Sequence, residues 1–258
     1  MSAKRSPVRS PPVTREAPPG VRVSLILRRL RRAYPEAKIA LHFSTPFECL
    51  VATMLSAQST DVTVNEVTRR LFVKYRAPED YLAVPEEELQ ADIYQTGFFR
   101  QKTRSLKKMS HKLIDDHGGE VPHTMRELVA LPGVARKTAN IVQGNCFPRD
   151  MRRDPDAGLA VDTHVGRVAV RLGLTKRTSK EAVDIEQDLM ALIPRKDWLK
   201  TTYLFIEHGR AVCDAKHPRC EDCAVERLCP SSQAVGLPDL YRRSERKPTG
   251  PHRNPGPP

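Results

Sequence analysis

Apolar residues recur along most of this chain at the three- and four-residue spacing that places them on one face of a helix. Near the N-terminus, Val23, Ile26, Leu27 and Leu30 fall on one side of a segment whose opposite side carries arginines. Helices are predicted at 22–34, from Pro46 to 57, from a cap at Ser59 or Thr60 to Tyr75, and at 86–95, 100–116, 124–131, 136–146, 163–172, 179–193 and 196–211. Strand-like alternation and Asn-Gly hairpin turns are missing. The pattern therefore predicts an all-α protein of about ten helices, with antiparallel pairs at the shortest loops.

The charge of the chain points to a phosphate-rich partner. Lys and Arg number 43 against 31 Asp and Glu, which gives a net charge of +12. Residues 1–20 and 236–258 share this excess with the body between them, and because both ends are rich in Pro and Gly we expect them to be disordered basic tails. No apolar run is long enough for a membrane span, and the N-terminus lacks the apolar stretch of a secretion signal. A cytoplasmic nucleic-acid-binding protein is expected.

Four cysteines lie close together in one short segment. Cys213, Cys220, Cys223 and Cys229 read C-x6-C-x2-C-x5-C. Such a segment can surround one compact metal centre, and ligation by cysteine alone from one tight run favours a [4Fe–4S] cluster. Zinc stays open as an alternative, although a zinc ribbon has two C-x2-C pairs and this segment has one. Disulfides are a second alternative, which the absence of an export signal disfavours.

Two helices joined by a hairpin turn are predicted at Leu131-Pro132-Gly133-Val134-Ala135-Arg136-Lys137. The glycine lets the backbone approach a ligand closely, and the unpaired N–H groups of the new helix form a phosphate site. Lys137 would lie in the first turn of that helix, beside Arg136 and the positive end of the helix dipole. Both favour the neutral amine, which is a nucleophile. An ordinary helical hairpin with a solvated Arg-Lys pair is the alternative.

Asp162 lies in the segment Val161-Asp162-Thr163-His164, directly before a predicted helix. Its side chain is placed to cap that helix, and this role alone would explain an aspartate here. A carboxylate at this position beside a nucleophilic amine could also stabilise positive charge. His164 alone indicates a packed or solvated histidine.

Taken together, these segments resemble endonuclease III, a family of helix-hairpin-helix DNA glycosylase/lyases. The matching residues are LSAQSTDVTVN at 55–65, LPGVARKTAN at 131–140, VDTHVGRV at 161–168 and HGRAVC with the cysteine run at 208–229. The resemblance covers roughly 22–235. It implies two helical domains flanking a DNA-binding cleft: a six-helix barrel with the hairpin at 42–150, and a [4Fe–4S] cluster domain built from the helix at 21–41 together with 151–235.

The resemblance also implies roles for individual residues. Lys137 would be the nucleophile and Asp162 its charged partner, while the four cysteines would hold the cluster. Gln58 would fill the space left by an extruded nucleotide, and Phe98, in the loop Gly97–Lys102, would wedge into the base stack. The remaining DNA contacts would be Gly133 and Val134 of the hairpin, and Lys216 and Arg219 between the first two cysteines. The chain departs from the family at Phe98, often Leu, and at Ala135, usually Gly.

The implied activity is base-excision repair of double-stranded DNA that contains oxidised pyrimidines or abasic sites, by a monomer. The lysine would displace the damaged base as a Schiff base, and β-elimination would then cut the strand 3′ to the abasic site. Two alternatives remain. An adenine glycosylase of mismatch repair shares the hairpin and the cysteine spacing, but it lacks the lysine and carries an extra C-terminal domain. A cluster-bearing DNA-binding or redox-sensing module without enzymatic activity would use Lys137 only as a phosphate contact.

Overall fold

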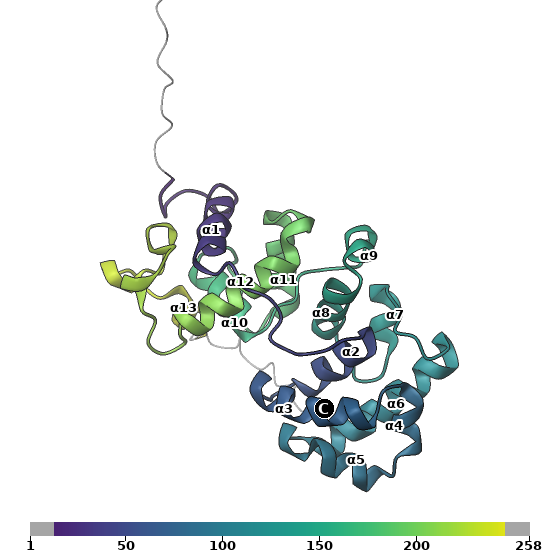
Figure 1. Cartoon of the computed structure of the whole chain (residues 1–258). Coiled ribbons are helices and arrows are strands. Elements are labelled where there is room, and N and C mark those ends of the chain that lie inside the picture. Colours follow the sequence, from purple (N-terminus) through teal and green to yellow (C-terminus); the bar gives the residue numbers. More distant parts are fainter. Residues whose placement is uncertain (1–12, 246–258) are drawn as a thin grey trace, which may run out of the picture. The chain divides into compact units, whose positions relative to one another are not determined.

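The computed structural model describes residues 13–245, in which helices are joined by loops and turns and no β-strand is found (Figure 1). The predicted all-α class is confirmed. The α-helices are α1 (Pro19–Ala33), α2 (Pro46–Leu55), α3 (Asp61–Lys74), α4 (Pro78–Ala83), α5 (Glu86–Ile93), α6 (Phe99–His117), α7 (Met125–Ala130), α8 (Arg136–Cys146), α9 (Pro148–Arg153), α10 (Thr163–Arg171), α11 (Ala182–Leu192), α12 (Trp198–Ala211) and α13 (Leu240–Glu245). Short 3-10 turns include η1 (Tyr94–Thr96) and η3 (Cys220–Asp222). No helix in this range is long and apolar enough to cross a membrane.

The chain divides into two compact units. The first, which we call the hairpin unit, comprises Glu36–Asp162 and Pro194–Tyr203. The second, the cysteine unit, comprises the described parts of Met1–Pro35, Thr163–Ile193 and Leu204–Pro258. The N-terminal helix α1 thus groups with the four cysteines, while the hairpin unit continues past residue 150 to Asp162.

The core of the hairpin unit is built around α2 and α6. Nearly every residue of α2 is buried, as expected for a helix that is apolar on all sides. It packs against α3, α6 and α8, and α6 in turn packs against α4 and α5, which lie beside it in Figure 1. The buried face of α6 carries Leu106, Met109 and Leu113, all fully inaccessible. This packing fixes the starts of α6 and α8, where the predicted wedge and nucleophile lie.

The core of the cysteine unit uses the predicted stripe of α1. Val23, Ile26, Leu27 and Leu30 are all buried, which confirms the expected face of this helix. Helix α11 packs on both α1 and α10, and α13 packs on α10. The cysteine segment itself contains only 3-10 turns and loops, so side chains from the neighbouring helices must hold its backbone.

Three short helices differ from the sequence prediction. Helices α4 and α9 each have six residues and begin with a proline, and this length is too short to show a helical period. Helix α13 lies inside the segment expected to be a disordered tail, where tertiary contacts of Asp239 order it. Within the predicted N-terminal tail of residues 1–20, the described part includes the ion pair of Arg15 with Glu226 at 3.0 Å and the start of α1 at Pro19. Residues 1–12 and 246–258 of the two predicted tails fall outside the described residues. The predicted cap at Thr60 is confirmed, since its hydroxyl accepts a hydrogen bond from Thr63 N at 3.2 Å.

Candidate functional site

The predicted hairpin connects α7 and α8 in the hairpin unit. Leu131 and Val134 anchor it because both side chains are buried, and Val134 N donates to the Leu131 carbonyl at 3.1 Å. Gly133 has a φ of +80°, and a Cβ there would lie 2.9 Å from the Cβ of Ser105 and 3.0 Å from Cε of Met54. Only glycine fits this turn, for both conformational and steric reasons. The side chain of Val134 faces the core, so any DNA contact at this residue is left to its main chain.

Lys137 is exposed at the second position of α8, directly after the hairpin. Ala135 occupies the N-cap position and provides no side-chain cap. No side chain at the cap therefore occupies the first N–H groups of α8, which is the arrangement that suits a phosphate. The hairpin thus places a cationic amine and a positive helix end side by side.

Asp162 is half-buried and ends a buried segment that is tied to α8. Gly158 N donates to Oδ1 of Asn140 at 2.8 Å, and Asn140 lies three residues after Lys137 on the same helix. On the other side, Thr202 Oγ1 donates to the Ala160 carbonyl at 3.1 Å. These two hydrogen bonds hold the segment that precedes Asp162, and the first of them ties this segment to α8, the helix that carries Lys137. Sequence reasoning missed Asn140, although it closes the LPGVARKTAN motif.

Gln58 and Phe98 share an unusual backbone conformation. Within residues 13–245 they are the two non-glycine residues with positive φ, at 54° and 47°. Each such residue costs about 1–3 kcal/mol, and the conformation persists only where the surrounding structure enforces it. Both side chains are exposed, and the large apolar ring of Phe98 is 60 % exposed. The two residues predicted to probe the duplex are therefore held out of the protein by strained turns.

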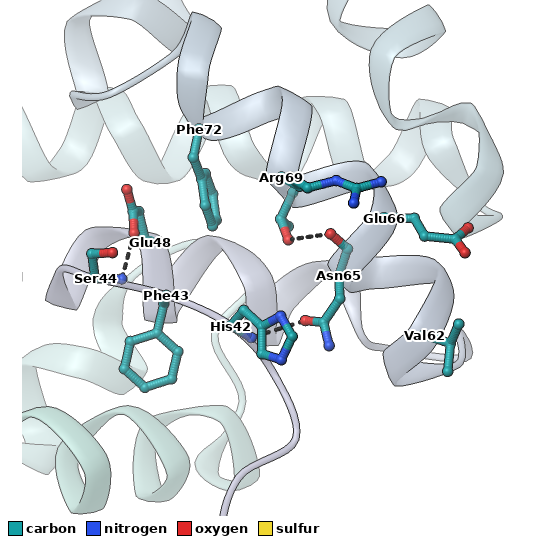
Figure 2. A pocket seen from close by; sticks show the side chains of 10 residues that line it. His42, Phe43, Ser44, Glu48, Val62, Asn65, Glu66, Arg69 and Phe72 are labelled. Atoms are coloured by element: carbon teal, nitrogen blue, oxygen red, sulfur yellow. Dashed lines mark hydrogen bonds between the residues drawn. The ribbon is translucent and has the colours of Figure 1, made fainter.

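A separate pocket of about 490 Å³ lies in the hairpin unit between the His42–Ser44 segment and α3 (Figure 2). Asn65 stabilises its wall, because its Oδ1 accepts a hydrogen bond from His42 N and its Nδ2 donates to the Ala40 carbonyl, both at 2.9 Å. Ser44 N donates to Glu48 Oε2 at 2.6 Å on the opposite side. None of the predicted site residues lines this pocket. The two hydrogen bonds of Asn65 give this residue of the LSAQSTDVTVN motif a structural role.

The four cysteines of the cysteine unit line one cavity. Cys213, Cys220, Cys223 and Cys229 contribute to its wall together with Arg171, His208 and several apolar and hydroxyl residues. All six cysteines of the chain are free thiols, so the disulfide alternative is not realised. Burial raises the pKa of the Cys223 and Cys229 thiols to about 12. Thiolates form in such a cavity only when a cationic centre compensates their charge.

Two arginines of α10 hold the loop that carries the first cysteine. Arg167 donates to the carbonyls of Gly209 and Cys213, both at 3.0 Å. Arg171, one turn later, donates to the carbonyls of Asp214 and Ala215 at 2.5 and 3.0 Å, and its Nη1 lies 3.4 Å from Cys213 Sγ. The sequence signal was available, because these two arginines share a helix face at i and i+4 and the residues beside them, Val165, Gly166 and Val168–Val170, are apolar or small.

The guanidinium of Arg171 also forms an ion pair with a residue of the C-terminal segment. Asp239 accepts hydrogen bonds from Arg171 at 2.9 and 3.2 Å, and the two side chains are only 6 % and 3 % exposed. On the far side of α10, Arg22 donates to the carbonyls of Leu172 and Leu228 at 2.6 and 2.9 Å. Buried arginines of α1 and α10 therefore hold the cysteine loop, and Asp239, directly before α13, pairs with one of them.

The predicted DNA contacts of the cysteine loop are both exposed. Lys216 N donates to Oδ1 of Asp214 at 2.8 Å, which shapes the turn and leaves the ammonium in solvent. Arg219 donates to the carbonyl of Ala211 and lies 3.7 Å from the carboxylate of Asp222. The side chains of Lys216 and Arg219 thus extend from a loop whose backbone carbonyls are bound by the arginines of α10.

The comparisons with known proteins agree with this arrangement. Residues 51–195 match the HhH-GPD superfamily of base excision DNA repair proteins. The chain is 44 % identical to the endonuclease III of Bacillus subtilis over 86 % of this chain and 97 % of the relative. It is 46 % identical to the endonuclease III of Synechocystis sp. over 83 % and 94 %, and 36 % identical to that of Escherichia coli K12 over 82 % and 96 %.

Two solved structures of endonuclease III with DNA are also similar. A non-covalent complex superimposes with a TM-score of 0.77 and 42 % identity, covering 84 % of this chain and 97 % of the other. A trapped covalent intermediate gives the same TM-score and identity, with 84 % and 98 % covered. Neither the adenine glycosylase nor the non-enzymatic alternative is favoured by these similarities. The chain belongs to the endonuclease III family of the HhH-GPD superfamily, whose members are base-excision repair enzymes, and it is a DNA glycosylase and AP lyase.

Proposed function

We propose that this enzyme excises oxidised pyrimidines from double-stranded DNA and then cuts the strand at the abasic site, with Lys137 as its nucleophile. The observation that carries the proposal is the position of Lys137: exposed in the first turn of α8, after a hairpin that only Gly133 can form. Asp162, at the end of the segment tied to α8 by Asn140, is the proposed charged partner.

The chemistry follows from these groups. The damaged nucleotide must leave the base stack, because its sugar carbon is unreachable inside a duplex. The amine of Lys137 then attacks C1′ of the deoxyribose, the C1′–N bond to the base breaks, and the base leaves with the bonding electrons. The lysine nitrogen then loses a proton while the C1′–O4′ bond of the sugar ring opens and O4′ becomes a hydroxyl, which gives the Schiff base. The Schiff base acidifies the neighbouring C2′–H, and loss of this proton breaks the C3′–O bond and expels the 3′ phosphate by β-elimination. The carboxylate of Asp162 stabilises the positive charge that develops on the sugar.

The replacement Asp162→Asn is expected to slow base release by about a hundredfold or more, because it removes the charge that stabilises the cationic transition state. The amide keeps a side-chain oxygen for capping α10, so the free energy of unfolding should change by at most about 1 kcal/mol. Single-turnover base release and thermal unfolding measure the two effects. A variant that keeps its rate would show that the carboxylate charge is not used.

The proposed DNA contacts of the hairpin unit are the hairpin N–H groups, Gln58 and Phe98, and those of the cysteine unit are Lys216 and Arg219. Phosphate contacts should dominate affinity for undamaged duplex, so this affinity should fall steeply with salt. Gln58 and Phe98 are the residues proposed to contact the bases, and their exposed side chains lie on strained turns.

Replacing both Lys216 and Arg219 with alanine should weaken binding to all duplexes alike. The slope of log affinity against log salt should become less steep by about one for each phosphate that the variant no longer neutralises. Fluorescence anisotropy with undamaged duplex at several salt concentrations measures this slope. Lys180→Ala, which removes an exposed lysine between α10 and α11, is the control and should leave the slope unchanged. An unchanged slope in the double variant would remove Lys216 and Arg219 from the DNA surface.

We propose that Cys213, Cys220, Cys223 and Cys229 hold a [4Fe–4S] cluster. The donor set fits, because four thiols line one cavity and burial disfavours the thiolates of Cys223 and Cys229 unless a cation is present. Four cysteines from one tight run, with a single C-x2-C pair, favour a cluster over zinc. When bound it would supply structural organisation of the loop, and the residues described above perform the reaction.

Anaerobically purified protein is expected to be yellow-brown and to contain about four irons per chain, without stoichiometric zinc. Elemental analysis and the visible spectrum measure this. Cys220→Ser should lower both iron content and solubility, because the loop loses its organising centre. Cys49→Ser, outside the cavity, is the control for iron content. One zinc and no iron in the wild-type protein would overturn the proposed cluster.

The hairpin unit is proposed as the six-helix barrel domain and the cysteine unit as the cluster domain. The protein is proposed to be a monomer that works on DNA in the cytoplasm, at the nucleoid of a bacterial cell.

The function is tested with duplexes that each carry one defined oxidised pyrimidine or one abasic site. Base release and strand cleavage are measured separately, and borohydride is added to trap a Schiff base. We expect release, cleavage and a covalent adduct. Cleavage of abasic duplex without release of any oxidised pyrimidine would leave only the lyase.

A further inference from the structure

Lys102 is a buried lysine whose ammonium binds main-chain oxygens and no carboxylate within the described chain. It lies in the first turn of α6 and is 8 % exposed. Its Nζ donates to the Leu55 carbonyl at 2.7 Å and to the Thr96 carbonyl at 2.8 Å. Burial lowers the pKa of this amine to about 8. A buried cation without a carboxylate partner is unfavourable, and a methionine would fill the same volume without this desolvation.

The two carbonyls stand at the base of two different loops. Leu55 is the last residue of α2, and the loop that follows it carries Gln58. Thr96 is the last residue of η1, and the loop that follows it carries Phe98. Gln58 and Phe98 are the two non-glycine residues with positive φ in residues 13–245. One ammonium therefore binds the residue that precedes each of the two strained loops.

Lys102 is linked to the second loop by its backbone as well. Its own N–H donates to the Phe98 carbonyl at 3.0 Å, and the hydroxyl of Thr96 donates to the Ile93 carbonyl at 2.8 Å. Thr96 is itself buried, so its carbonyl cannot move without disturbing η1. The first loop otherwise makes only local hydrogen bonds, at Ser56, Ala57 and Ser59. Its distance to the second loop therefore depends on Lys102.

We propose that Lys102 is a positioning residue for nucleotide extrusion: it fixes the Gln58 loop and the Phe98 loop to one another, so that both side chains enter the duplex as a preformed pair. This inference rests on the proposed roles of Gln58 and Phe98. It explains why a costly buried ammonium occupies a position where an apolar side chain would serve the core. The partner it acts on is the stacked duplex, and the step it assists precedes the chemistry at Lys137.

The test compares Lys102→Met with Lys107→Met. Lys107 lies on the same helix and also donates to two carbonyls, those of Leu82 at 3.3 Å and Val84 at 2.5 Å, but neither of these precedes a strained loop. Base release from damaged duplex is measured under single-turnover conditions. Lys102→Met should be slower by about tenfold to a hundredfold, the range expected when reacting groups are misplaced. Lys107→Met should stay within about twofold of the wild type, because extrusion does not use it.

A second substrate separates this inference from the proposed function. Single-stranded DNA with one abasic site offers its sugar without extrusion, so borohydride trapping on it should be equal in Lys102→Met and the wild type. A wild-type protein that forms no adduct would refute the nucleophile and not the positioning role. If Lys102→Met, with an unchanged melting temperature, loses trapping and duplex activity in parallel, or loses neither, the positioning role is overturned.

Coupling between the two loops gives a measurement that does not depend on the folding of Lys102→Met. Gln58→Ala and Phe98→Ala both change exposed side chains, and a preformed pair should make their effects on duplex base release non-additive. We expect the double variant to be at least about threefold faster than the product of the two single effects. Effects that multiply independently would show that the loops act separately, which contradicts the proposal.

Discussion

Replacing Lys137 with glutamine should abolish base release and strand cleavage together, with a loss of at least about a thousandfold, and should remove the borohydride adduct. The amide cannot attack C1′ or form a Schiff base. Lys137 is exposed at the start of α8, so its replacement should change the free energy of unfolding by no more than about 0.5 kcal/mol. DNA binding should persist, because the hairpin does not depend on the lysine side chain. Single-turnover release, gel analysis of cleavage and trapping measure the three effects.

The matched control for this prediction is Lys38→Gln, which removes the same charge from an exposed lysine of the hairpin unit. It should retain both activities and the adduct. If Lys137→Gln releases an oxidised pyrimidine at nearly the wild-type rate, water is the nucleophile and the coupled glycosylase/lyase mechanism is wrong.

Replacing Arg171 with methionine should lower the free energy of unfolding of the cysteine unit by about 3–5 kcal/mol. The change removes the buried cation that pairs with the carboxylate of Asp239 and removes the donors to the carbonyls of Asp214 and Ala215. The cysteine loop and α13 should loosen together, because Arg171 is the side chain that joins them. Thermal unfolding and the iron content of the purified protein measure the effect.

Arg242→Met is the control for the Arg171 prediction. Arg242 lies 3.6 Å from the same carboxylate of Asp239, but its side chain is 48 % exposed. An exposed ion pair contributes little, so we expect a change within about 1 kcal/mol. Equal decreases in stability in the two variants, or none in Arg171→Met, would show that the buried pair does not hold the loop.

Local patterns in the sequence are enough to predict most helices and the chemistry of the site. The stripe of α1, the proline start of α2, the cap at Thr60 and the hairpin at Gly133 are all found at their predicted positions. These features depend on neighbours within one or two helical turns, and such neighbours are adjacent in the sequence. The same holds for the clustering of the four cysteines, because their spacing limits them to one loop.

Other features depend on partners distant in the sequence. The polar composition of α13 predicts a disordered tail, whereas its order comes from the pairing of Asp239 with Arg171, 68 residues earlier. The resemblance implies a DNA contact at Val134, and only the structure shows that its side chain lies in the core, which leaves the predicted contact to the main chain. Arg171 and Lys102 are charged residues that are buried against main-chain carbonyls. No periodic pattern in the sequence distinguishes such residues from charged residues in solvent.

The sequence by itself determined the helical class, the family resemblance and the residue types at the site, because each of these is written in short-range spacing. The tertiary structure alone decided that Gln58 and Phe98 adopt left-handed conformations and that one buried lysine lies beneath both loops. Carbonyls at the ends of α2 and η1 are 41 residues apart in the chain, and only packing brings them to the same ammonium. Strain at a loop is tolerated where distant contacts enforce it, and those contacts are not encoded in the residues of the loop itself.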